Sequence, residues 1–279
     1  MKRITAIFCL LALTALAADV VVWDRATQTA SWGVVDANNV VAIFTAAGGG
    51  EDTNQWALSY NKGENDCLYT SQDFTNLFSS TTASCTLLMW VNITDAGGDQ
   101  EYGFFEMSRA DPVNGAFIFE FIEGWGINAL GVRLTSGGWS PATAGFAPTY
   151  DAWHLVGVVK SNNQYTFTID AVNDSAKTIN TASTAYGKLY IGDNDPSWGG
   201  RGFNGGLRKV WMWNRALAFS EVTNLYNAGV WTTNYPASGL VAYWPCNEGT
   251  GTNVADLIGG NIAHFGTGDA APTWINWPQ

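Results

Sequence analysis

The chain has 279 residues and is acidic, with 24 Asp and Glu against 13 Lys and Arg, which gives a formal net charge of −11. A charge of this sign repels nucleic acid and anionic lipid, so we expect neither as a partner. Charged residues make up only 13% of the chain, whereas 31 Gly and 14 Trp are present, and this mixture favours strands and tight turns over helices.

The N-terminus has the pattern of a secretory signal. Two basic residues stand at the start, an apolar run covers residues 7–13, and Ala15 and Ala17 mark a small-x-small cleavage site. The run is too short for a membrane span, which takes about 20 residues. We therefore expect residues 1–17 to be a signal peptide, the mature chain to begin at Ala18, and the protein to be secreted or displayed on the cell surface without a transmembrane segment.

Short runs rich in apolar residues follow, separated by loops of Gly, Asn, Asp and Pro. The clearest runs are residues 84–92, 116–121, 130–134, 154–159, 165–169, 188–191 and 207–213. Many short strands at this spacing predict an all-β sandwich or jelly roll. One short helix is predicted near residues 220–228, where Ser220 can cap the first turn, Val222 and Leu225 share a face, and Gly229 ends the pattern.

Four segments stand in a recognisable order. Residues 57–69 read ALSYNKGENDCLY, residues 85–91 read CTLLMWV, residues 153–159 read WHLVGVV, and residues 203–229 begin FNGGLRKVWMWNRAL. In this order and spacing they resemble the laminin-G-like jelly roll of the concanavalin A-like lectin/glucanase superfamily. The resemblance covers about residues 57–229 and implies a concanavalin A-like sandwich of two antiparallel sheets.

The C-terminal segment, residues 230–279, is unusual. Residues 239–256 (GLVAYWPCNEGTGTNVAD) are similar to the segment with which most members of that family begin. The domain is either circularly permuted, with this segment packed on the same sandwich, or followed by a truncated second copy. We favour permutation, because about forty residues cannot bury their own apolar face. Residues 18–56 match no family segment, and residues 20–23 and 40–44 predict additional strands whose placement the sequence leaves open.

Three cysteines follow the signal peptide: Cys67, Cys85 and Cys246. In an oxidising compartment an odd number predicts one disulfide and one thiol, but the sequence does not say which two pair. Zinc is disfavoured because the spacings do not suit it and only His154 and His264 are present.

Glucanases share the implied fold, so the spacing of carboxylates in the sequence shows whether catalysis is to be expected. Retaining glycosidases need two carboxylates about 5–5.5 Å apart. Glu120 and Glu123 are three residues apart, so a strand places them on opposite faces. The pair also lacks the intermediate Asp of the glucanase E-x-D-x-E motif, and His154 has no Ser or Cys at a suggestive spacing. We expect no enzyme, and a glycoside hydrolase or polysaccharide lyase is the least favoured alternative.

Carbohydrate binding needs a rigid aromatic ring beside a few convergent polar groups. Trp125, Trp139 and Trp198 stand in glycine-rich loops, where little neighbouring bulk can bury them. Arg201 and Asn204 could supply hydrogen bonds beside Trp198. These five residues are the predicted ligand-binding residues.

The family resemblance also implies calcium, which many members hold through loop carboxylates. Asp193 and Asp195 alternate in one loop, and Asp256 matches the family's V-x-D-x-x-G position. These three are the expected ligands of a structural Ca²⁺. One departure weakens the expectation, because Arg208 and Lys209 stand where relatives usually have two acids.

Two hypotheses of different class follow. The leading hypothesis is a secreted or surface-displayed, lectin-like module that binds a glycan or polysaccharide without catalysing a reaction. The alternative is a structural or adhesive protein that self-associates through its jelly roll and its C-terminal tail.

Overall fold

The computed structural model describes residues 18–24, 29–35, 41–44, 54–71, 74–78, 80–94, 100–107, 117–124, 126–134, 142–180, 189–193, 202–267 and 271–277, and only the backbone of those before residue 54. The chain divides into two units. The smaller unit contains a three-stranded antiparallel sheet of β1 (Ala18–Asp24), β2 (Thr29–Val35) and β3 (Val41–Phe44). β1 and β3 lie on the two segments expected to add strands.

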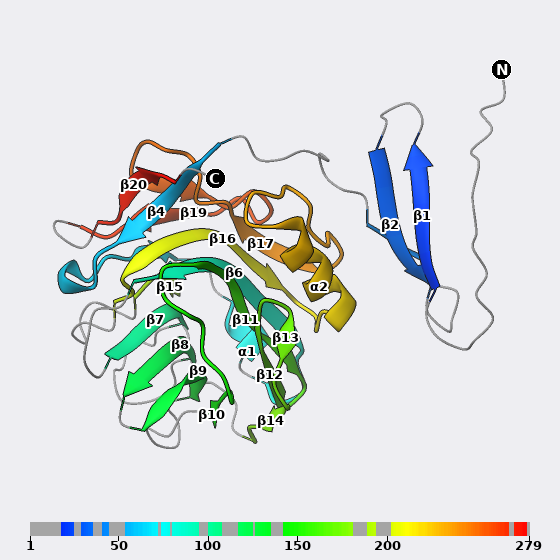
Figure 1. Ribbon diagram of the computed structural model, residues 1–279, viewed down its shortest axis with the longest axis horizontal. Helices are drawn as coiled ribbons and strands as arrows, with labels where there is room; N and C mark the ends of the chain where they lie inside the picture. The colour runs from blue at the N-terminus through cyan, green and yellow to red at the C-terminus, as the bar shows by residue number, and fades with distance from the viewer. Residues whose placement is uncertain are drawn as a thin grey trace. The chain divides into compact units, whose positions relative to one another are not determined.

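The larger unit, residues 54–230 and 239–279, holds two sheets (Figure 1). The eight-stranded sheet has the spatial order β10 (Ala142–Thr143), β9 (Ile127–Leu134), β8 (Phe117–Gly124), β7 (Gln100–Met107), β15 (Leu189–Ile191), β5 (Leu68–Thr70), β19 (Ile262–Phe265) and β18 (Asn253–Ala255). The nine-stranded sheet has the order β13 (Val172–Asn173), β12 (Gln164–Ile169), β11 (Trp153–Ser161), β6 (Cys85–Ile93), β16 (Gly205–Trp213), β4 (Trp56–Tyr60) and β20 (Thr273–Asn276), with β14 (Lys177–Thr178) beside β12 and β17 (Leu240–Trp244) beside β16. These two antiparallel sheets confirm the predicted all-β sandwich.

The core lies between the two sheets. Alternate residues of each strand supply it, as the period of two in a strand requires. In β6 these are Leu87, Met89 and Val91, and in β8 they are Phe117 and Phe119, all fully buried. The apolar runs seen in the sequence are therefore the inward faces of paired strands.

The C-terminal segment contributes strands to both sheets. β17 pairs with β16 and β20 pairs with β4 in the nine-stranded sheet, whereas β19 pairs with β5 in the eight-stranded sheet. Trp244 of β17 is fully buried in the core. Burial in the same core supplies the apolar contacts that a segment of this length cannot make alone.

In the described part of the chain, three short helices accompany the strands: η1 (Lys62–Glu64), α1 (Thr75–Phe78) and α2 (Phe219–Ala228). The last one confirms the predicted helix. Its start differs, because Ala218 is the N-cap residue and Ser220 lies inside the first turn. The expectation that Ser220 caps the helix was therefore wrong.

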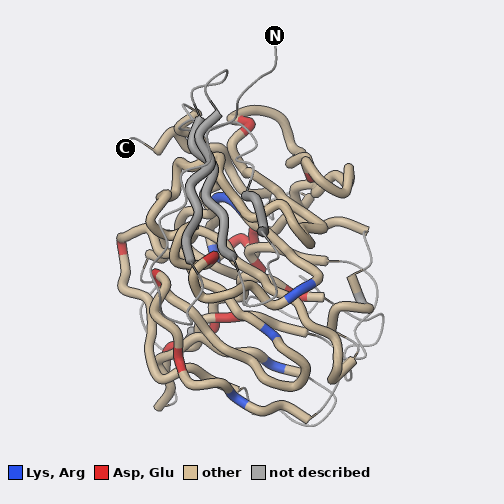
Figure 2. Tube along the Cα trace, turned by 90° about the vertical axis from the view of Figure 1, so that its right-hand side faces the viewer, with Lys and Arg blue, Asp and Glu red and all other residues tan. Residues whose placement is uncertain are grey.

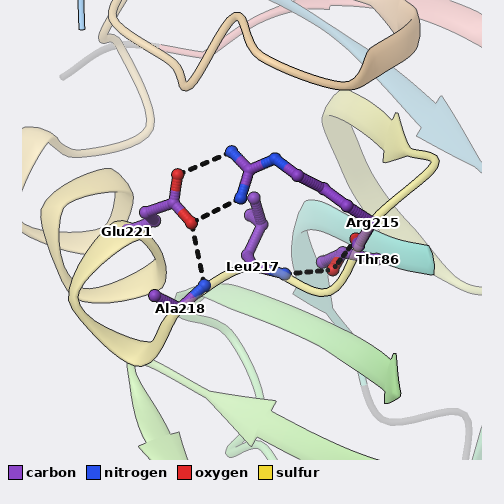
Figure 3. Close-up of polar contacts among 5 residues, drawn as sticks. All are labelled: Thr86, Arg215, Leu217, Ala218 and Glu221. Carbon is purple, nitrogen blue, oxygen red and sulfur yellow. Dashed lines mark hydrogen bonds and ion pairs between the residues drawn. The ribbon is translucent and has the colours of Figure 1, made fainter. Parts of the chain in front are cut away.

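Glu221 performs the capping (Figure 3). Its carboxylate accepts the Ala218 N–H at 2.8 Å and forms two short contacts with the guanidinium of Arg215, at 2.7 and 2.6 Å. The Thr86 hydroxyl of β6 donates to the Arg215 carbonyl and accepts the Leu217 N–H, each at 2.9 Å. These bonds hold α2 against the outer face of the nine-stranded sheet.

The cysteines do not form the predicted disulfide. Cys67, Cys85 and Cys246 are all buried, and no disulfide joins any of them. Among the described residues, no helix is long and apolar enough to cross a membrane.

Candidate functional site

One row of paired residues crosses the eight-stranded sheet from β9 to β18. In order of pairing, the row consists of Arg133, Ile118, Glu106, Tyr190, Tyr69, His264 and Asn253. Directly paired residues on neighbouring strands project from the same face of a sheet. The seven side chains therefore share one face, and we call this set the cross-strand row.

The cross-strand row lies on the face that is turned away from the core. The strand neighbours of Tyr190, which are Leu189 and Ile191, belong to the core, and so does Leu68 beside Tyr69. Because successive residues of a strand point to opposite faces, Tyr190 and Tyr69 project outward. The sheet thus presents two tyrosines, a histidine and an amide on one side of the sandwich.

An irregularity in β7 places Glu106 in the row. The pairing of β7 with β8 shifts register between Gly103 and Phe105. At this bulge the consecutive residues Phe104 and Phe105 both enter the core, so Glu106 takes the outward position. Glu101, on the other side of the bulge, pairs with Ile122 and faces the same way. The bulge therefore gathers carboxylates on the outer face.

Arg133 binds two of these carboxylates. Its Nε lies 2.9 Å from Glu120 Oε1 and its terminal nitrogen lies 2.6 Å from Glu101 Oε1. Burial acts to lower the pKa of Arg133, but the two glutamates outweigh that effect and raise it. Lys62 Nζ donates to the backbone carbonyl of Glu101 at 3.1 Å. Charged residues are sparse along the described chain (Figure 2), so this concentration of charge is a local feature of the face.

Exposure increases along the cross-strand row. Arg133, Glu106 and Tyr190 are buried, whereas Tyr69 is half-buried and His264 is exposed. The Tyr69 and His264 rings are 5.7 Å apart between centroids, with an interplanar angle of 42°. His264 Nδ1 lies 2.7 Å from the Asn253 amide oxygen, which fixes the imidazole ring. The accessible end thus offers two oriented rings beside polar groups, an arrangement suited to a sugar ring.

Most of the predicted ligand-binding residues lie outside the described residues, namely Trp125, Trp139, Trp198 and Arg201. They stay predictions. Asn204 is described and half-buried, and its amide nitrogen lies 3.4 Å from the carbonyl of Thr94. Its side chain is thus engaged by the loop after β6.

The expected calcium ligands also lie partly inside and partly outside the described residues. Asp195 lies outside the described residues, and Asp193 is fully buried after β15. Asp256 Oδ1 accepts the N–H groups of Tyr243 at 2.9 Å and Ile258 at 3.0 Å, so this carboxylate organises a turn. Among the described residues, no group of three or more His, Cys, Asp or Glu could hold a metal ion. Calcium at Asp193, Asp195 and Asp256 stays a prediction.

Two residues considered for catalysis have structural partners. Glu120 faces outward, and Glu123 lies on the other face of β8, as their spacing predicts. His154 Nδ1 lies 2.6 Å from Asp170 Oδ2, and its Nε2 lies 2.8 Å from Thr149 Oγ1. Asp170 Oδ1 also accepts the N–H of Leu155, the residue next to His154, at 2.9 Å. The carboxylate therefore ties β11 to the turn after β12.

Comparisons with known proteins place the fold. A family model described as the concanavalin A-like lectin/glucanases superfamily matches residues 62–223. A search of curated proteins returns no match. Among solved structures, a proposed carbohydrate binding protein from Bacteroides ovatus has a TM-score of 0.57 and 14% identity, over 81% of this chain and 60% of that chain. The enzymatically active domain of bacteriophage CBA120 tailspike protein 2 has a TM-score of 0.51 and 11% identity, over 70% of this chain and 30% of that chain.

The chain therefore spans less than two thirds of the length of either solved structure. At these identities the likeness concerns the fold.

Proposed function

The chain belongs to the concanavalin A-like lectin/glucanase superfamily, and from that premise we propose that it is a secreted or surface-displayed protein that binds carbohydrate without catalysing a reaction. The observation that carries the proposal is the cross-strand row, with Tyr69, His264 and Asn253 at its accessible end. The description of the Bacteroides ovatus protein as carbohydrate-binding is consistent with this function.

The physical chemistry of sugars supports the proposal. The C–H faces of a pyranose ring are apolar and pack on aromatic rings, while its hydroxyls need hydrogen-bond partners. Tyr69 and His264 supply the rings, and Asn253 lies beside them with a polar amide. These residues sit on β5, β19 and β18, so paired backbones hold the site rigid before a ligand arrives.

The state of the carboxylates favours binding over hydrolysis. A glycosidase needs one carboxyl group that stays protonated near its working pH and a second that attacks or activates water. Arg133 holds Glu120 in a buried ion pair, and such a neighbour favours the ionised carboxylate. Glu101 binds the same guanidinium. The engagement of both glutamates by one cation supports the proposal of binding without catalysis.

Affinity electrophoresis tests the proposal. The full chain is run through native gels that contain xylan, arabinan, galactan, mannan or laminarin, and retardation measures binding. Tyr69→Ala is expected to weaken binding about tenfold or more, because an aromatic anchor at the centre of a site carries much of the affinity. Tyr226→Ala is the matched control, since Tyr226 is an exposed tyrosine on α2 that stacks on Trp90 at 6.1 Å.

Two results would contradict the proposal. One is a wild-type chain that migrates normally in every gel. The other is a Tyr69→Ala chain that is folded, as its melting temperature reports, and still binds as tightly as the Tyr226→Ala chain.

Self-association is the second candidate, because exposed apolar side chains gather near the edge of the eight-stranded sheet. Leu257 is 60% exposed, Ile258 43% and Ile262 49%, at the turn between β18 and β19 and at the start of β19. Exposed apolar groups beside an edge strand are typical of contact surfaces. Sedimentation velocity tests this candidate. A wild-type oligomer that Ile258→Lys dissolves would favour self-association, and a monomeric wild-type chain would exclude it.

A further inference from the structure

A second row of paired residues crosses the other sheet. In order of pairing, it consists of Trp153, Asn92, Gly206, Ser59 and Thr273, from β11, β6, β16, β4 and β20. The strand neighbours of these residues face inward, as Val91 and Ile93 do on β6 and Leu58 does on β4. The five residues therefore share the outer face of the nine-stranded sheet, and we call them the second row.

Two tryptophans stand over this row. Trp277 follows β20, where its N–H bonds to the Gln55 carbonyl at 2.8 Å. Its ring meets the ring of Trp153 at 5.1 Å between centroids and an interplanar angle of 68°. A Cβ atom at Gly206 would lie 2.8 Å from the Trp277 ring and 3.1 Å from the Trp153 ring. Only glycine leaves room for both rings above this point of the sheet.

The row also contains a polar group whose hydrogen-bonding capacity is not used. The buried Nε1 of Trp153 has no acceptor in the described part of the chain. The Asn92 side chain beside it is only 4% exposed and carries an amide that can both donate and accept. Buried polar groups are nearly always hydrogen-bonded, and one left unpaired weakens the fold. A ligand that accepts a hydrogen bond from this N–H would remove that cost.

We propose that the second row is an additional carbohydrate subsite, separate from the cross-strand row. A pyranose ring packs against Trp277 and Trp153, and its hydroxyls bond to the Asn92 amide and the Trp153 Nε1–H. Ser59 and Thr273, which are half-buried and exposed, add hydroxyls at the rim. The row contains no charged residue, so the subsite takes an uncharged hexose or pentose unit of a polysaccharide.

Two subsites on the outer faces of the two sheets give the protein a property that neither has alone. One molecule can hold two polysaccharide chains, or two segments of one chain, at the same time. Simultaneous binding raises the overall affinity without any new contact. The second subsite consists of different residues from the cross-strand row. The proposal of a second subsite can therefore hold even if the cross-strand row does not bind sugar.

The first variant is Asn92→Leu, which keeps a similar volume and removes the amide. We expect binding in the polysaccharide gels to fall about tenfold. Trp277→Ala should weaken binding in the same gels, and Ile275→Ala is its control, because Ile275 is an exposed apolar residue of β20, the strand that Trp277 follows.

A bridging assay separates the two subsites. Protein is bound to immobilised polysaccharide, and capture of the same polysaccharide in labelled, soluble form is then measured. Wild type is expected to capture it, whereas Tyr69→Ala and Trp277→Ala should each bind the surface and fail to bridge.

If only Tyr69→Ala reduces binding, the second subsite is overturned and the first stands. If only Trp277→Ala and Asn92→Leu reduce binding, the second subsite stands and the cross-strand row is not a binding site. Folded Asn92→Leu and Trp277→Ala chains that bind as wild type does, or no binding by wild type, also overturn the second subsite.

Discussion

The guanidinium Nε of Arg133 lies 2.9 Å from Glu120 Oε1, on the face of the eight-stranded sheet that is turned away from the core. The two residues come from neighbouring strands, β9 and β8, and both are buried. The same guanidinium binds Glu101 at 2.6 Å. One cation therefore compensates two carboxylates at a place where water does little to screen them.

Removal of this cation should destabilise the protein strongly. Arg133→Met keeps most of the side-chain volume but leaves Glu120 ionised, buried and uncompensated, and we expect a loss of about 3–5 kcal/mol in the free energy of unfolding. Urea denaturation measures the change. Lys177→Met is the control, because Lys177 forms a more exposed pair with Asp174 at 3.0 Å and should change the same free energy by less than about 1 kcal/mol. Equal losses in both variants would contradict the interpretation.

Asp66 should make stability depend on pH. Its carboxylate is buried and accepts the Asn61 N–H at 2.6 Å, and burial raises its pKa to about 6, against about 3.9 for an exposed Asp. Because the folded state binds the proton more tightly, this contribution is fully present below about pH 4 and is lost as the pH rises through 6.

Asp66→Asn should remove that dependence. Relative to wild type, the variant is expected to gain stability steadily between pH 4 and pH 7. Urea midpoints at each pH give the difference directly. A constant difference across this range would show that Asp66 does not titrate in the folded protein.

The buried cysteines predict a definite pattern of thiol labelling. Burial raises the pKa of Cys85 to about 12, and burial also raises the pKa of Cys246, so neither forms the reactive thiolate near neutral pH. In the folded chain we expect no alkylation of Cys67, Cys85 or Cys246. After unfolding without a reductant, all three should be alkylated, as peptide mass spectrometry can establish. If two cysteines of the unfolded chain resist labelling until a reductant is added, the disulfide predicted from the sequence forms after all.

The sequence predicted the structural elements that depend on local residue patterns. Alternating apolar residues and intervening Gly, Asn and Asp clusters identified the strands, and the spacing of Val222 and Leu225 identified α2. The capping of α2 was missed because Glu221 reaches back to Ala218, and that contact depends on Arg215 as well. The disulfide was predicted from the number of cysteines and the expected oxidising compartment, and neither determines whether two of the three side chains lie close together.

The cross-strand row could not be predicted in the same way. Tyr69, Tyr190 and His264 are far apart in sequence and meet only because β5 lies between β15 and β19. Their strands are three or four residues long, which is too short for alternation to reveal an outer face. The loop tryptophans were visible as a pattern of Trp and Gly, and they remain predictions.

Gly206→Ala tests the geometry of the second row without touching a polar group. The added methyl would lie 2.8 Å from the Trp277 ring and 3.1 Å from the Trp153 ring, so at least one ring must move. Such overpacking costs about 1–3 kcal/mol, and we expect a lower melting temperature, a changed near-ultraviolet circular dichroism signal from the tryptophan pair, and loss of bridging. Gly63→Ala is the control, because its methyl would meet nothing closer than 3.4 Å. Gly63→Ala should keep wild-type stability, dichroism and bridging. If Gly206→Ala keeps them as well, then the two rings do not pack over Gly206 in solution, and the geometry proposed for the second subsite is contradicted.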